Sequence, residues 1–521
     1  MLKASGAMAI ATMSSRLLGM VREIVYYGFM GTGWVNDAFQ YAFTIPNLFR
    51  RLLGEGALTA AFIPVFKEKE RLHGEVEMWR SANAVVSGLI VAASAVTVVV
   101  MLAISVALAA HGFSEKTTLM LQLLRVMFPY MVLVCLAAAM MGMLNARAHF
   151  FIPAMGATML NVVMIASVFW FAPHFGVGLP KDQRLPVQIF ALAYGVLVAG
   201  AAQAAFQMPT LWRDGFRYQW VTPWGDPTVQ RVVKQMIPGA IGVAAFQINV
   251  ALVQLVALHA GDGIVASFQG AVRLMELPQG VFGISLATYL LPTLSGLAAE
   301  KNYPEFRATL RHGLGSLIFM NAIACVLLVA LATPIVRLLF EHGAFTPTST
   351  LRVASALQCL APGLVMFSTV NVLARAFYAL GDTHTPMKIS LACLVINFAG
   401  GGALIFVLQE RGPGIANTVT SVLNAGLLFF ALRKKLGKLE LQALYDTLPV
   451  IVIAALVTGF LSWYGWGMWE QLLGHGNIAL KFGAVFVPAG VAAGLYWLTA
   501  LAFKIPAARE MTEFALAKFK K

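Results

Sequence analysis

Residues 82–110 read ANAVVSGLIVAASAVTVVVMLAISVALAA and contain no charged side chain. A helix rises 1.5 Å per residue, so about 20 apolar residues cross the roughly 30 Å hydrocarbon core of a bilayer. Backbone groups in lipid must find their hydrogen-bond partners within the chain, and a run of this length therefore predicts a membrane-spanning helix.

Similar apolar runs, separated by polar breaks, recur on both sides of this one. They predict an all-α polytopic membrane protein with about 14 transmembrane helices. The predicted spans cover residues 8–30, 35–66, 82–110, 118–144, 152–173, 186–211, 232–259, 264–298, 314–333, 350–378, 386–408, 412–432, 444–467 and 478–503.

The composition of the 521 residues agrees, because 59% are hydrophobic and only 12% are charged, against about 25% in soluble proteins. It excludes a disordered chain, a secreted disulfide scaffold and a soluble DNA-binding domain. The net charge of +14 is then explained by basic membrane loops, and no nucleic-acid partner is expected. The four cysteines lie singly in apolar runs and no HExxH motif is present, so no metal site is expected.

Lysines and arginines in the predicted loops alternate between many on one side and few on the other. The richer side includes both ends of the chain, so the positive-inside rule predicts cytoplasmic N- and C-termini. Lys116 and Lys181 are among the few basic residues on the opposite side.

Three sequence matches, each separated by 228 or 229 residues, indicate an internal duplication. Phe39-Gln40-x-Ala42 matches Phe268-Gln269-x-Ala271, Ile63-Pro64 matches Leu291-Pro292, and Ala146-Arg147 matches Ala374-Arg375. We expect two parallel six-helix lobes, with a substrate site between them as in transporters. The predicted domains are an N-lobe at 1–222, a C-lobe at 223–440, and two extra C-terminal helices at 441–521, which are either an added substrate surface or a stabilising appendage.

Several charged residues fall inside the predicted spans. Placing an arginine at the middle of a membrane helix costs about 2.5–3.5 kcal/mol on translocon-insertion scales, so these side chains must face one another or water. Local spacing allows three pairs, Arg16 with Glu23, Arg51 with Glu55, and Arg273 with Glu276. The charges in the spans are Arg16, Arg22, Arg50, Arg51, Arg125 and Arg273, and Glu23, Asp37, Glu55 and Glu276.

Arginines outnumber the acids in this set, so a cavity lined by them favours an anion. The planar guanidinium group binds phosphate or carboxylate with two parallel hydrogen bonds, and a cluster of several suits a pyrophosphate. The predicted ligands are Arg16, Arg22, Arg50 and Arg273, whereas Arg125, close to Pro129, is interpreted as structural.

Glycine and proline interrupt two of the charged spans. Gly54-Glu55-Gly56 breaks the second span, and Pro278, Gly280 and Gly283 weaken the eighth. Broken helices beside a cavity are typical of transporters, although small residues also serve close helix packing.

With these residues in view, the chain resembles the MurJ/MviN family of lipid II flippases, in the multidrug/oligosaccharidyl-lipid/polysaccharide exporter superfamily. The resemblance extends over nearly the whole chain. It rests on Ser15-Arg16-Leu17-Leu18-Gly19 with Arg22-Glu23, on Asp37-Ala38-Phe39, on Pro46-Asn47-Leu48-Phe49-Arg50-Arg51 with Glu55-Gly56-Ala57, and on Arg273-Leu274-Met275-Glu276-Leu277-Pro278.

The resemblance implies a non-enzymatic transporter in the bacterial inner membrane that moves lipid II, an undecaprenyl-pyrophosphate-linked disaccharide pentapeptide, to the outer leaflet by alternating access. Arg16, Arg22, Arg50 and Arg273 match the family's cavity arginines. The matching gating and ion-pair positions are Glu23, Asp37, Arg51, Glu55 and Glu276. The two extra helices would form a groove for the lipid tail.

The chain departs from the family at Val272, where relatives often have aspartate, and at Thr44 and Asn371, where some have lysine. Some relatives bind sodium, and the corresponding candidates here are the uncharged Asn249 and Asn397. We therefore expect no cofactor, with coupling to the membrane potential or to a monovalent cation left open. A monomer is expected.

Three other functions fit parts of the sequence. An exporter of another polyprenyl-linked oligosaccharide would share the fold and the arginines. An enzyme acting on polyprenyl phosphates would need a carboxylate cluster such as DDxxD, which the sequence lacks. A scaffold for cell-wall synthesis proteins could use the basic loop from Lys67 to Arg80, although a solvated membrane-surface loop explains its charges as well.

Overall fold

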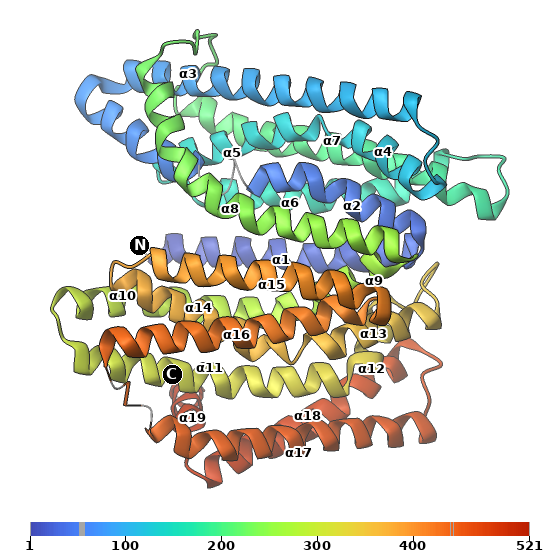
Figure 1. The fold of residues 1–521 in the computed structure, drawn as a ribbon, viewed down its shortest axis with the longest axis vertical. Coiled ribbons are helices and arrows are strands. Elements are labelled where there is room, and N and C mark those ends of the chain that lie inside the picture. The colour runs from blue at the N-terminus through green and yellow to red at the C-terminus, as the bar shows by residue number, and fades with distance from the viewer. Residues whose placement is uncertain (1, 52–57, 438, 441, 520–521) are drawn as a thin grey trace. The chain divides into compact units, whose positions relative to one another are not determined.

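The computed structural model describes residues 2–51, 58–437, 439–440 and 442–519, and there the chain is built from helices without a strand (Figure 1). The predicted all-α class is confirmed. Nine helices of this part are long and apolar enough to span a membrane, or up to eleven if each bent pair counts as one. About 14 spans is consistent with this number, because α1, α2 and α8 lie where three further spans are predicted.

The chain forms two compact units, Met1–Leu258 and His259–Lys521. In the first unit, the helices pack mainly on partners that are not adjacent to them in the sequence. Its helices are α1 (Leu2–Met30), α2 (Trp34–Phe49), α3 (Leu58–Ala110), α4 (Glu115–Met127), α5 (Tyr130–Ala146), α6 (Phe151–Ala166), the short turns η2 (Ser167–Phe171) and η3 (Ala172–His174), α7 (Lys181–Arg213) and α8 (Pro227–Ala260), whose last residues pass into the second unit.

The second unit contains the eighth to fourteenth predicted spans and a terminal helix. Its elements are α9 (Ile264–Pro278), the π-helical turn η4 (Gln279–Ile284), α10 (Ser285–Ala299), α11 (Tyr303–Ala330), α12 (Ala332–Phe340), α13 (Pro347–Leu360), α14 (Gly363–Ala379), α15 (His384–Leu408), α16 (Arg411–Leu436), α17 (Gln442–Leu472), α18 (Ile478–Ala502) and α19 (Pro506–Phe519).

The helices are interrupted both between and inside the predicted spans. Between the second and third spans, helix α3 changes direction at Gly74, whose φ of 82° suits glycine. The fourth span is two helices, α4 and α5, bent by 42° where Pro129 precedes α5, and the tenth is α13 and α14, bent by 46° where Pro362 precedes α14. Proline lacks the N–H that would continue the helical ladder, which accounts for both bends.

The three matches that indicate a duplication lie on helices or at a helix end. Ala146 is the last residue of α5 and Arg147 follows it, whereas Ala374 and Arg375 lie inside α14. The matches at Phe39 and Ile63 fall within α2 and α3, and their counterparts within α9 and α10.

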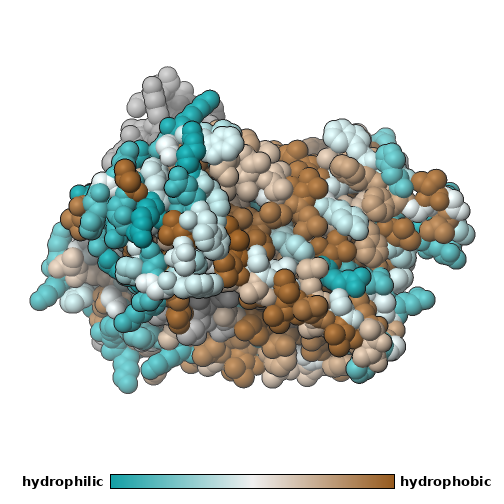
Figure 2. All heavy atoms as spheres, turned by 90° about the horizontal axis from the view of Figure 1, so that it is seen from above, coloured by the Kyte–Doolittle hydropathy of each residue, from teal (hydrophilic) through white to brown (hydrophobic). Residues whose placement is uncertain are grey.

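Apolar packing holds each unit together. In the first unit, buried side chains of α3, α5 and α7 form a cluster that includes Phe62, Phe66 and Met143. In the second, α10, α11, α14 and α16 share a core around Leu294 and Phe306. Figure 2 shows hydrophobic side chains across the middle of one face and hydrophilic side chains gathered mainly toward one end.

Charged residues from loops predicted on the same membrane side meet at one end of the first unit. Arg147 Nη1 lies 2.6 Å from Glu70 Oε1 and 2.8 Å from Glu75 Oε1. Arg231, near the start of α8, binds both carboxylate oxygens of Glu68 at 2.8 Å. Within this unit, the contacts agree with the predicted alternation of the loops.

Gly200 provides a test of helix packing between α5 and α7. A Cβ there would lie 2.7 Å from Cδ2 of Tyr130 and 2.9 Å from Cβ of Leu133. We expect Gly200→Ala to destabilise the detergent-solubilised protein by about 1–3 kcal/mol through overpacking, measured by thermal unfolding. The control is Gly402→Ala in α15, where nothing lies within 4 Å of the added Cβ. Equal stability of Gly200→Ala and the parent would contradict the packing described.

A second test concerns the turn between α14 and α15. Asp382 Oδ2 accepts hydrogen bonds from Lys435 Nζ at 2.7 Å and Thr385 Oγ1 at 2.9 Å. The Lys435 ammonium, followed by the backbone N–H of Thr385, holds the pKa of Asp382 well below its usual range. A lowered pKa in the folded state means that the stabilisation is complete above the unfolded value of about 3.9 and is lost as the pH falls through the folded value.

We therefore expect Lys435→Met to lower stability at pH 7 by about 0.5–1 kcal/mol, because the pair is partly exposed and screened by solvent. The loss should shrink at high salt and as the pH falls below about 4. Thermal unfolding across pH measures it, with the exposed neighbour Lys434→Met as the control. A loss that is independent of salt and pH would contradict the ion pair.

Candidate functional site: charged residues on apolar helices

Helix α1 carries two of the predicted arginines. Arg22 and Glu23 are both buried and form an ion pair, and the guanidinium carbon of Arg22 lies 5.4 Å from the centre of the Tyr26 ring. The predicted partner of Glu23 was Arg16, which lies about two turns earlier and is exposed. Nε of Arg22 is buried without a hydrogen-bond partner in the described part of the chain, so one N–H group of this guanidinium is not used in a hydrogen bond there.

Asp37 lies in the first turn of α2 and is completely buried. Its Oδ2 is 3.6 Å from Nζ of Lys116, whose side chain is only 14% exposed. The resemblance places Asp37 among the gating and ion-pair positions, and the pattern of apolar runs places Lys116 in a loop. The structure thus adds a lysine to the set of charged residues within the apolar part of the first unit.

The other end of α2 carries Arg50 and Arg51, which lie in a π-helical turn and are both partly buried. Nε of Arg50 donates to Oδ1 of Asn47 at 2.8 Å. The predicted partner of Arg51, Glu55, lies outside the described residues, as does the Gly54-Glu55-Gly56 break.

In the second unit, Arg273 and Glu276 form the ion pair that their spacing allows, with Nη1 2.8 Å from Oε2. Both side chains are partly exposed, at 31% and 47%. The π-helical turn η4 follows one residue after Pro278, so the eighth span is broken next to this pair. A Cβ at Gly283 in η4 would lie 2.5 Å from Oγ of Ser368, which shows that this glycine permits close packing of η4 on α14.

The remaining predicted residues lie apart from these pairs. Arg125 is exposed on α4. Asn249 is buried in α8, and Asn397 in α15 donates to Oδ1 of Asn417 at 3.2 Å and to Oγ1 of Thr420 at 3.1 Å. In the part of the chain that the structure describes, no group of three or more His, Cys, Asp or Glu side chains could hold a metal ion.

Two of the three positions that depart from the family pattern make local hydrogen bonds. Thr44 Oγ1 donates to Oε1 of Gln254 on α8 at 2.9 Å, and Asn371 donates to the carbonyl of Phe367 one turn earlier at 3.1 Å. Val272 is partly buried beside Arg273. None of these three residues brings a charge to the site.

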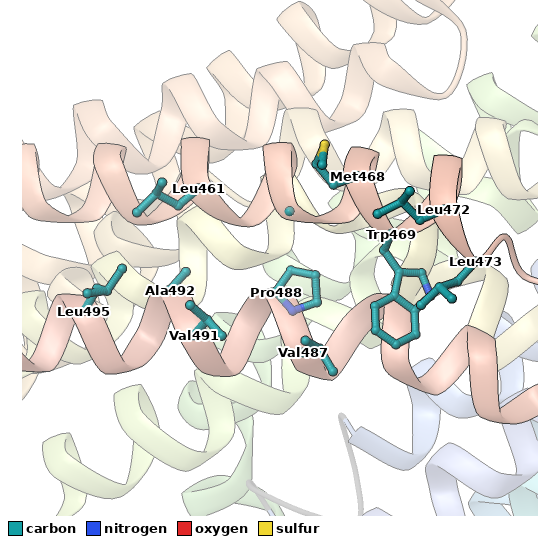
Figure 3. Close-up of a pocket in the computed structure, with 11 residues that line it drawn as sticks. Leu461, Met468, Trp469, Leu472, Leu473, Val487, Pro488, Val491, Ala492 and Leu495 are labelled. Carbon is teal, nitrogen blue, oxygen red and sulfur yellow. The ribbon is translucent and has the colours of Figure 1, made fainter.

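An apolar groove runs along α17 and α18 (Figure 3). It consists of two hollows of about 320 and 300 Å³ that share Leu461 and Leu495. Trp469 lies at one end, where its Nε1 donates to the carbonyl of Leu480 at 3.1 Å, and a side chain at Gly483 would overlap its ring. The lining of the first hollow is Leu461, Gly465, Met468, Trp469, Leu472, Leu473, Val487, Pro488, Val491, Ala492 and Leu495.

Comparison with known proteins identifies the family. The family model described as "Lipid II flippase MurJ" matches residues 27–481. This chain belongs to the MurJ family. It is 33% identical over 497 residues to "Probable lipid II flippase MurJ" of Rhizobium tropici, covering 94% of this chain and 92% of that protein. It is 31% identical over 509 residues to "Lipid II flippase MurJ" of Burkholderia cenocepacia, covering 94% and 95%.

Solved structures agree on the fold of this MurJ family member. The structure titled "Lipid II flippase MurJ, inward closed conformation" matches with a TM-score of 0.75 and 21% identity, covering 95% of this chain and 98% of that one. An inward-facing multidrug resistance MATE family transporter matches with a TM-score of 0.67 and 15% identity, covering 83% and 99%. The family match and the curated relatives show that the chain is a multi-pass inner-membrane protein of a transporter family rather than an enzyme.

Lys116 is the charged residue of this family member that sequence reasoning missed. It precedes the predicted fourth span by two residues, so the pattern of apolar runs assigns it to solvent. A signal was nevertheless present, since Asp37 lies in an apolar run and a buried carboxylate needs a cation. The sequence could not say which cation, because the two residues are 79 positions apart.

Proposed function

We propose that this chain translocates lipid II from the cytoplasmic to the outer leaflet of the inner membrane by alternating access, supplying the precursor for peptidoglycan synthesis. The observation that carries the proposal is the match to the lipid II flippase family over residues 27–481. Export of another polyprenyl-linked oligosaccharide would use the same fold, but the named relatives favour lipid II.

The proposed ligands for the pyrophosphate and sugar are Arg16, Arg22, Arg50 and Arg273. Two observations support this role for Arg22 in particular. Its charged side chain is buried on an apolar helix. Burying a charge there costs free energy, and charged residues in membrane helices often mark functional sites. Nε of Arg22 has no hydrogen-bond partner in the described residues, which leaves one N–H of the guanidinium group to donate to an anionic oxygen.

The acidic residues are proposed to pair with arginines and, together with Arg51, to gate access to the site. In this role Glu23 and Glu276 hold Arg22 and Arg273 in place between transport events. Pyrophosphate competes for the same guanidinium groups, so substrate binding and opening of these ion pairs are coupled. Asp37 and Glu55 are proposed gating residues on the same grounds of charge within an apolar segment.

The groove along α17 and α18 is proposed to hold the polyprenyl tail. It is lined almost entirely by apolar side chains, and Val487 and Val491 in its wall are 49% and 63% exposed. An isoprenoid chain is the part of lipid II that gains from such a surface, because burying each CH₂ group is worth about 0.8 kcal/mol.

The remaining proposals concern the setting of the transporter. Both termini are proposed to be cytoplasmic, with lobes at 1–222 and 223–440 and the tail-binding helices at 441–521. The chain is proposed to act as a monomer among membrane lipids, with cell-wall synthesis proteins as partners. Coupling to the membrane potential or to a monovalent cation is the proposed energy source, and the uncharged oxygens near Asn397 suit a monovalent ion better than a divalent one.

The decisive experiment removes one arginine from each unit. We expect Arg22→Ala and Arg273→Ala each to abolish the appearance of lipid II on the outer leaflet in cells depleted of their own flippase. The physical reason is the loss of a bidentate donor to pyrophosphate. Accessibility of lipid II to an external enzyme measures transport, and immunoblotting of membranes measures the protein.

The matched control is Arg71→Ala, which removes an exposed arginine from the loop after the second predicted span. It should transport lipid II like the parent. Full transport by both Arg22→Ala and Arg273→Ala would reject the arginine site. Failure of the parent itself, with the protein present in the membrane, would reject lipid II as the substrate.

The tail groove has its own test. Val491→Trp adds bulk to the exposed wall of the groove, so we expect slower transport because the tail is excluded. Leu498→Trp on the same helix is the control, since Leu498 is similarly exposed at 63% and does not line either hollow. Initial rates of lipid II appearance compare the two variants, and equal rates would argue against a tail site here.

A further inference from the structure

Lys116 occupies a position that its own helix does not favour. It is the second residue of α4, where the exposed N–H groups of the first turn create a partial positive charge that repels a cation. Its side chain nevertheless lies largely buried, with Nζ directed to Oδ2 of Asp37 at 3.6 Å. The local helix therefore does not explain this lysine, whereas the carboxylate of α2 does.

The ion pair sets one end of a parallel contact between two helices. At the other end, the rings of Phe49 and Phe128 meet edge to face with centroids 5.8 Å apart. Asp37 and Phe49 are 12 residues apart, as are Lys116 and Phe128. Helices α2 and α4 thus run side by side in one register, and the Lys116–Asp37 pair and the phenylalanine pair both depend on it.

The second unit contains an analogous fastening built from different residues. Helix α13 corresponds to α4, and α9 corresponds to α2. Arg352 of α13 donates to the carbonyl of Asp262, just before α9, at 2.8 Å and pairs with Glu410 at 3.0 Å. In each unit, a basic residue near the start of one helix holds the start of the helix packed against it.

We propose that Lys116 is a positioning residue for lipid II translocation. Its ammonium group neutralises Asp37 and fixes the register of α2 against α4, and this register places Arg50 and Arg51 at the far end of α2. Lys116 itself does not contact the substrate. The transport part of this inference rests on the proposed function, whereas the register part does not.

The experiment compares Lys116→Met, which keeps a side chain of similar length and removes its charge, with Lys116→Arg, which keeps the charge. The matched control is Lys181→Met, because Lys181 is also a lysine in the first turn of a helix but is exposed. Transport is read as complementation of a flippase-depleted strain, normalised to the protein in the membrane. We expect Lys116→Met to lose complementation, and Lys116→Arg and Lys181→Met to retain it.

Register is read separately, by crosslinking cysteines placed at Phe49 and Phe128 in a background without the four native cysteines. Lys116→Met should lower the crosslinking yield, and Lys116→Arg should restore it. If Lys116→Met does not accumulate, the double variant Lys116→Met/Asp37→Asn replaces it. Removing both charges leaves no uncompensated carboxylate, so accumulation of the double variant alone supports the pairing.

Two results would overturn the proposal: complementation by Lys116→Met at the parental level, or loss of complementation with an unchanged crosslinking yield. The first would show that the pair is dispensable, and the second that Lys116 acts otherwise than through the register. If the parent fails to restore external lipid II, the proposed function fails, and the crosslinking yields still decide whether Lys116 sets the register.

Discussion

The cost of a charge inside a bilayer is the constraint on which the rest of this structure depends. The apolar helices carry arginines and carboxylates that lipid cannot solvate, and the fold must supply partners for them. Three kinds of ion pair do this in the described residues. Arg22 and Glu23 are neighbours in the sequence, and Arg273 and Glu276 lie about one helical turn apart. Lys116 and Asp37 come from two different helices. The last arrangement constrains the tertiary structure most, because it joins separate elements.

The same constraint explains where the helices are irregular. Backbone breaks are tolerated at membrane depth only where other parts of the protein cover them. Pro129 and Pro362 bend the fourth and tenth spans, and the π-helical turn after Pro278 packs Gly283 against Ser368. Two of the irregular turns, at Arg50 and after Glu276, adjoin charged residues that are proposed to handle the substrate.

The two appended helices carry a groove that is lined by uncharged side chains. Helices α17 and α18 are fastened to α12 through Arg337 and Glu470, 2.9 Å apart, and through Lys481 and Glu341, 3.5 Å apart. At the other end, Tyr496 of α18 donates to the carbonyl of Phe319 of α11 at 2.8 Å. The groove is therefore held to the second unit at both ends, which suits a surface that guides a long apolar chain.

Much of this protein could be read from its sequence, because the strongest signals in a membrane protein are local. An uncharged run such as 82–110 must be a helix wherever it lies, and the spacing of Arg273 and Glu276 is enough to allow their pair. The internal duplication stays a prediction, because it rests on three short sequence matches. Only the tertiary structure decided which cation Asp37 receives and which register α2 adopts on α4, since both depend on side chains from helices far apart in the chain.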